Sequence, residues 1–175
     1  MTMDIQDPQG ETRDDVNKMI SESIKWRGTV VDKCIFLERC IDNYLAYFFC
    51  LGNDEKGQQL IELILSTDRI TFSGKQQVLK FVIDKYKMDF VAKYPNYNKD
   101  IVDLIQHRNI FAHYLLDTTN AGVIKFREDG TIGFLKFKNS MEVVEYSVAN
   151  LEKIRNDLHK YMNAFRIEVT AGSPW

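Results

Sequence analysis

The chain has 175 residues, with 23 lysines and arginines against 25 aspartates and glutamates, and a formal net charge of −2. Hydrophobic residues make up 45% and charged residues 27%. These values are ordinary for a globular domain and exclude disordered and collagen-like classes. We therefore expect a single domain over 1–175. The near-neutral charge excludes a generally polybasic protein and leaves room for a local basic groove.

Nothing in the sequence points to a membrane or to an oxidising compartment. No apolar run reaches the roughly 20 residues of a transmembrane helix, and the polar, acidic start is unlike a secretory signal. Cys34, Cys40 and Cys50 are odd in number and have the wrong spacing for a redox or zinc pair. We expect reduced, buried thiols in a cytoplasmic protein without a membrane partner.

Long helices are predicted for most of the chain, because two of its three prolines lie near the ends. Apolar residues recur at intervals of three and four, which is the spacing of one helix face. In chain order the predicted helices are 13–27, 29–51, 55–66, one starting at a Ser73–Gln76 capping box and carrying Val78 to Tyr86, 99–115 with Asn98 as its cap, and 147–167.

The apolar period changes between the last two predicted helices. β-type residues surround Asp129-Gly130, which is a strong hairpin turn signal, and Met141 to Tyr146 predict a third strand. We therefore expect a β insert over about 121–146, with loose tails at 1–12 and 170–175. The predicted fold is mainly α: a bundle of five to six helices with a small antiparallel hairpin before the last helix.

Basic residues concentrate between positions 69 and 99, where seven bases face two acids. One interpretation is a solvated helix face. The other is a patch for a phosphate backbone, with Lys75, Lys80, Lys85 and Lys87 as candidate RNA-binding residues.

Most templates for enzyme sites are missing from the sequence. It has no phosphate-binding or dinucleotide-binding glycine motif and no nucleophile elbow. Its histidines, His107, His113 and His159, do not fit the spacing of di-iron or zinc sites. We therefore expect neither a catalytic metal nor a cofactor.

One segment, Ile105 to His113, combines a cation, an amide and a titratable base. Projected on a helix, Ile101, Leu104, Ile105, Phe111 and Ala112 form an apolar stripe. Arg108 falls near the middle of that stripe, while Asn109 and His113 lie along its edge. A buried arginine needs a partner or ligand, because its charge cannot be removed. A structural alternative is that Arg108 snorkels, or pairs with Glu38 or Asp42.

The sequence Arg108-Asn109-Ile110-Phe111-Ala112-His113, preceded by Leu104 and Ile105, resembles the R-x(4–6)-H hallmark of the HEPN superfamily. The resemblance implies a helical bundle that dimerises and sets two such motifs in one cleft. It further implies a metal-independent endoribonuclease, often a toxin or defence effector, with RNA as substrate and an antitoxin or regulatory protein as a further partner. His113 would be the general acid or base, Arg108 would hold the scissile phosphate, and Asn109 would orient one of them.

Two other readings of the sequence stay open. A non-catalytic HEPN bundle would serve as a protein-interaction or RNA-binding subunit, and a purely structural helical protein would lock Arg108 and His113 in internal pairs. Independently of the motif, Tyr47, Phe49 and Cys50 lie outside the apolar stripe of the predicted helix 29–51. A helix that is apolar nearly all round should be covered, so the sequence predicts a homodimer.

Overall fold

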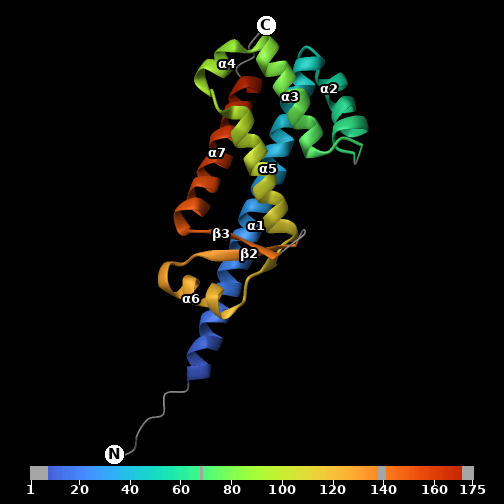
Figure 1. The fold of residues 1–175 in the computed structure, drawn as a ribbon. Helices are drawn as coiled ribbons and strands as arrows, with labels where there is room; N and C mark the ends of the chain where they lie inside the picture. Colours follow the sequence, from blue (N-terminus) through green and yellow to red (C-terminus); the bar gives the residue numbers. More distant parts are fainter. Residues whose placement is uncertain (1–7, 68, 138–140, 171–175) are drawn as a thin grey trace, which may run out of the picture. The chain divides into compact units, whose positions relative to one another are not determined.

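The computed structural model describes residues 8–67, 69–137 and 141–170 of the chain (Figure 1). Its contacts divide it into two compact units. The sheet unit comprises residues 8–31 and 109–153, and the helical unit comprises residues 32–108 and 154–170. No described helix combines the length and the apolar character that crossing a bilayer would require.

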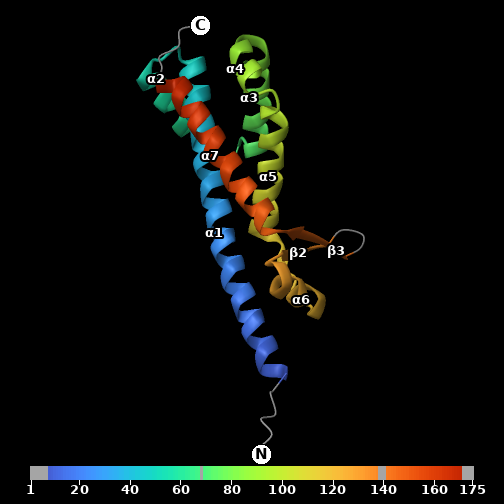
Figure 2. The same cartoon turned by 90° about the vertical axis from the view of Figure 1, so that its left-hand side faces the viewer.

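The first helix, α1 (Pro8–Phe49), is a single element of 42 residues (Figure 2). The sequence predicted two helices separated at residue 28, and this boundary is wrong. Gly28 is exposed, and a Cβ atom placed on it would meet nothing within 4 Å. One glycine lowers helix stability by only about 1 kcal/mol, which is too little to interrupt a long helix. Residues 8–12 of the loose tail predicted for 1–12 belong to α1, and residues 1–7 lie outside the described residues.

The helical unit continues with α2 (Asp54–Leu60), a π-helical turn η1 (Ile61–Leu65), α3 (Phe72–Tyr86), α4 (Met88–Lys93) and most of α5 (Tyr97–His113). It closes with the greater part of α7 (Val148–Thr170). Its core contains an aromatic group in which Phe90 stacks on Phe165, with ring centroids 5.5 Å apart.

Two predicted helix caps in this unit are wrong. Thr71, rather than Ser73, caps α3, because its hydroxyl accepts a hydrogen bond from the Gly74 amide. Asn98 lies inside α5 rather than before it, and its side chain accepts a hydrogen bond from Gln76. Both helices therefore start two residues earlier than the predicted caps indicated.

The sheet unit contains β1 (Leu115–Leu116), α6 (Asn120–Asp129), β2 (Ile132–Phe137) and β3 (Met141–Tyr146). The strands form an antiparallel sheet in the order β1-β2-β3, with Ile132 opposite Tyr146. The mainly helical fold with a small antiparallel hairpin before the last helix is confirmed.

The predicted hairpin turn at Asp129-Gly130 is wrong, because residues 120–129 form α6. Gly130 ends that helix in the left-handed conformation, with φ of 75°, and its amide donates to the Phe126 carbonyl. Aspartate-glycine ends a helix as readily as it turns a hairpin, since both need a residue that tolerates positive φ. The connection between β2 and β3 falls on residues 138–140, outside the described residues.

Candidate functional site

Helix α5 carries the whole HEPN-like segment up to its last residue. Ile101, Leu104, Ile105 and Phe111 are buried, as the predicted stripe requires, whereas Ala112 is exposed and does not belong to it. Arg108 is half-buried. Asn109 and His113 are exposed. The boundary between the two units falls after Arg108, so Arg108 belongs to the helical unit and His113 to the sheet unit.

In the sheet unit, the end of α5 is held by Arg27 of α1. Its guanidinium donates hydrogen bonds to the carbonyls of Phe111 and Tyr114, on either side of His113. The same group lies over the Phe134 ring, 4.7 Å from its centroid. Burial lowers the pKa of Arg27 from its ordinary value. A cation on the last carbonyls of a helix is also favoured by the helix dipole.

No sequence pattern pointed to Arg27, because its partners lie more than 80 positions further along the chain. It was one of many charged residues on an expected amphipathic helix, and only long-range packing reveals its role. The ring of Phe111 supports the same region: it packs against Phe134 and Tyr146, with centroid distances of 4.9 Å to each. The backbone around His113 is therefore fixed from two sides.

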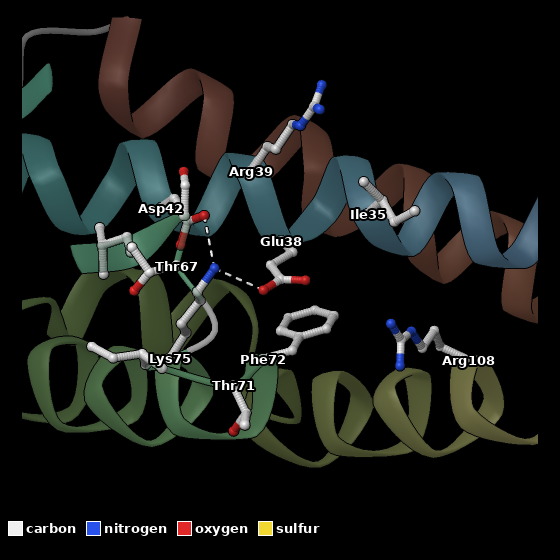
Figure 3. A pocket seen from close by; sticks show the side chains of 12 residues that line it. Ile35, Glu38, Arg39, Asp42, Thr67, Thr71, Phe72, Lys75 and Arg108 are labelled. Carbon is white, nitrogen blue, oxygen red and sulfur yellow. Dashed lines mark hydrogen bonds and ion pairs between the residues drawn. The ribbon is translucent and has the colours of Figure 1, made fainter. Parts of the chain in front are cut away.

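In the helical unit, Arg108 lines a cavity of about 500 Å³ (Figure 3), which we call the Lys75 cavity. It lies between α1, α3 and α5 and the segment that follows η1. Its walls combine apolar and charged side chains: Ile35, Leu65, Ile70 and Phe72 with Glu38, Arg39, Asp42, Lys75 and Arg108. In Figure 3 the guanidinium of Arg108 is turned toward Phe72.

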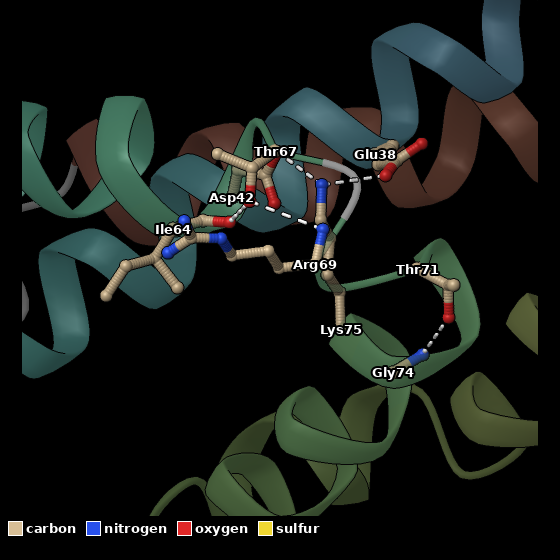
Figure 4. Close-up of polar contacts among 8 residues, drawn as sticks. All are labelled: Glu38, Asp42, Ile64, Thr67, Arg69, Thr71, Gly74 and Lys75. Atoms are coloured by element: carbon tan, nitrogen blue, oxygen red, sulfur yellow. Dashed lines mark hydrogen bonds and ion pairs between the residues drawn. The ribbon is translucent and has the colours of Figure 1, made fainter.

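Lys75 is 3% exposed and forms an ion-pair triad with two acids of α1 (Figure 4). Its ammonium lies 2.7 Å from Glu38 Oε1 and 2.9 Å from Asp42 Oδ2. Burial is the main cause that raises the pKa of Asp42, and Lys75 opposes that shift. The other Asp42 oxygen, Oδ1, is buried without a hydrogen-bond partner among the described residues. The acids that the sequence offered as partners of Arg108 are thus engaged by Lys75.

The four candidate RNA-binding lysines do not share one environment. Lys75 is buried between Glu38 and Asp42, with which it forms ion pairs. Lys80 pairs with Asp84 one helical turn away, and Lys87 lies 3.7 Å from Glu168. Lys85 is exposed, and its ammonium lies between 5 and 6 Å from the centres of the Phe81 and Tyr86 rings.

The cysteines and His159 are the other side chains that the sequence singled out as chemically reactive. Cys34 is buried, and burial raises its pKa to about 12, so it is a protonated thiol. All three cysteines are free. His159 of α7 lies 3.0 Å from the Lys33 ammonium. Within the described residues, no group of three histidine, cysteine, aspartate or glutamate side chains is placed to hold a metal ion.

Comparisons of this chain with protein-family models, with curated proteins and with solved structures find no match.

Proposed function

We propose that the chain is a cytoplasmic endoribonuclease of HEPN type, which acts as a homodimer and needs no metal ion. The observation that carries the proposal is the complete Arg-Asn-x-x-Ala-His segment on the last turns of α5. Its histidine and asparagine are exposed to solvent, and its arginine lines a cavity.

The residue types suit cleavage by the ribose 2′-hydroxyl. A histidine side chain can accept the proton of that hydroxyl or donate one to the leaving oxygen, so His113 would be the general acid or base. Arginine forms paired hydrogen bonds with phosphate oxygens and keeps its charge, so Arg108 would hold the scissile phosphate. Asn109 would orient one of these groups. The hold of Arg27 on the carbonyls around His113 supplies the fixed backbone that such a base needs.

The resemblance also suggests a biological setting for this activity, namely a toxin or defence effector restrained by an antitoxin or regulatory protein. A non-catalytic HEPN bundle that binds RNA or a protein is the competing function. It predicts the same fold and the same exposed α5 terminus, so cleavage itself has to separate the two.

The test is incubation of the purified full-length protein with a mixed-sequence single-stranded RNA in the presence of excess EDTA. We expect internal cleavage that leaves 2′,3′-cyclic phosphate ends, because the attacking group is the 2′-hydroxyl. His113→Ala should lower the rate by roughly two to four powers of ten, which is the usual contribution of a general acid or base. Arg108→Ala should also abolish cleavage.

The matched control is His159→Ala, since that histidine is also exposed but belongs to α7. It should keep the wild-type rate and melting temperature. RNA binding without cleavage by the wild type would favour the non-catalytic bundle. Activity that EDTA abolishes and magnesium restores would overturn the mechanism.

A further inference from the structure

The Lys75 cavity has the size of a small-ligand site. Its volume of about 500 Å³ lies within the roughly 300–1,000 Å³ of pockets that hold small molecules. It is contained in the helical unit. The buried triad of Lys75, Glu38 and Asp42 fixes one part of its wall, since each ion pair joins α3 to α1.

Three side chains of the cavity offer three different interactions. Phe72, the first residue of α3, is half-buried and presents an aromatic ring (Figure 3). Glu38 is 25% exposed on its side chain, so it is accessible, and Lys75 engages its Oε1. Arg108 supplies a permanent cation on the other side of Phe72.

Together these groups match one unpaired nucleotide of an RNA strand. Unstacked bases bind by stacking on aromatic rings and by hydrogen bonds along their Watson–Crick edges. An arginine forks onto phosphate oxygens. An ionised carboxylate accepts about four hydrogen bonds and donates none. Glu38 can therefore accept further hydrogen bonds in addition to the one from Lys75, and it favours a base whose edge carries only donors.

Guanine has that edge. Its ring N1–H and exocyclic amine are adjacent donors, which a carboxylate accepts in parallel. Adenine and cytosine place a ring acceptor beside their amine, and uracil places carbonyls on both sides of its N–H, so each would bring an oxygen or nitrogen lone pair against Glu38. We propose that the Lys75 cavity binds a guanine nucleotide, with its base at Phe72 and Glu38 and its phosphate on Arg108.

As a specificity site, the cavity rests on the proposed function, because Arg108 would then place the cut next to a guanosine. Its binding chemistry can be tested separately, since a mononucleotide has no internucleotide bond to cleave. The probes are GMP, AMP, CMP and UMP, titrated into the full-length protein by calorimetry. We expect GMP to bind at least about tenfold more tightly than the other three, because mismatched edges leave Glu38 facing lone pairs.

Two variants test the assignment. Glu38→Gln should remove the preference for GMP, since an amide presents one acceptor and one donor. Phe72→Leu should lower the affinity for all four nucleotides by a similar factor, since stacking does not discriminate among bases. Glu55→Gln, an exposed acid at the start of α2, is the matched control and should bind GMP as the wild type does. Thermal melts show whether Glu38→Gln remains folded. If Glu38→Gln does not fold, Phe72→Leu still tests whether the base binds at the Phe72 ring.

Equal binding of the four nucleotides, no binding of any at millimolar concentration, or an unchanged preference in folded Glu38→Gln would overturn the inference. RNA cleavage without a guanine preference would do so too, while leaving the proposed function intact. GMP binding by a wild type that does not cleave RNA would support the cavity assignment and overturn the nuclease.

Discussion

Lys75 shows how strongly one residue's surroundings can depart from what its type suggests. In the sequence Lys75 was one of seven basic residues spread between positions 69 and 99, yet it is 3% exposed between Glu38 and Asp42. A buried charge is tolerated only when it is paired. Removing one partner of such a pair is costly, because the remaining charges stay behind in a poorly solvated place.

We expect Lys75→Met to lower the free energy of unfolding by roughly 3–5 kcal/mol at neutral pH. The control is Lys80→Met on the same helix. Its ion pair with Asp84 is about half exposed, so its loss should cost less than about 1 kcal/mol. Urea unfolding of the two variants and the wild type measures both values, and equal losses in the two variants would contradict the buried triad.

The cost of Lys75→Met should depend on pH. Burial raises the pKa of Asp42 above its value in the unfolded chain, so the folded state binds the proton more tightly. Stability then falls as pH rises through the interval between the two values. Without Lys75 the pKa of Asp42 rises further. The pH range over which the ionisation of Asp42 destabilises the folded state then extends to higher pH. The difference between wild type and Lys75→Met should therefore shrink as the pH falls from neutral into the range where Asp42 is protonated. A constant difference would contradict this account.

At the scale of elements, two glycines with opposite roles distinguish a helix interior from a helix end. Gly28 lies in the middle of α1 with open space around its Cα. Gly130 ends α6 with a positive φ of 75°, and a Cβ there would meet Val148 at 3.1 Å.

Gly28→Ala should raise the free energy of unfolding by roughly 0.5–1 kcal/mol, because alanine is the better helix former. Gly130→Ala should lower it by roughly 1–2 kcal/mol, because an L-residue is strained in the left-handed region. Chemical denaturation of the two variants measures both signs. Destabilisation by Gly28→Ala would indicate a break in α1 after all, and a neutral Gly130→Ala would contradict the α6 cap.

Arg27 links two elements of the sheet unit, α1 and the end of α5. Arg27→Ala should lower the free energy of unfolding by roughly 1.5–3 kcal/mol, the usual contribution of a charged hydrogen-bonding group. Amide hydrogen exchange should become faster around Phe111 to Tyr114, where its two carbonyl partners lie. Arg13→Ala, an exposed arginine of the same helix, should change neither measurement. Unchanged exchange in Arg27→Ala would show that this contact does not hold the motif.

At the scale of the whole molecule, the proposed function requires a second copy of the chain. Phe49 at the end of α1 is 53% exposed, as the apolar character outside the main stripe of that helix indicated, whereas Tyr47 and Cys50 are half-buried. We expect light scattering at micromolar concentration to give twice the 20.5 kDa of one chain. Phe49→Asp should shift the mass toward one chain, and Leu63→Asp, at an apolar residue of η1 that is 66% exposed, serves as control. A wild type of 20.5 kDa would contradict the dimer.

Local spacing in the sequence was enough to determine most elements. Apolar residues at helical intervals predicted α5 and α7 to within a few residues, and Met141 to Tyr146 was correctly predicted as β3. The motif could be placed at the end of α5 for the same reason, because its six residues belong to the local apolar pattern that predicts that helix. These features depend on neighbours within one or two turns, which a sequence displays directly.

The tertiary structure alone decided which charges are buried and what they contact. Arg27 reaches Phe111 and Tyr114, and Lys75 reaches Glu38 and Asp42, across separations of more than 30 positions. It also decided that Asp129-Gly130 ends a helix instead of turning a hairpin, since the same dipeptide suits both. Such choices depend on the surfaces that pack against a residue, and residue type and spacing contain no record of them.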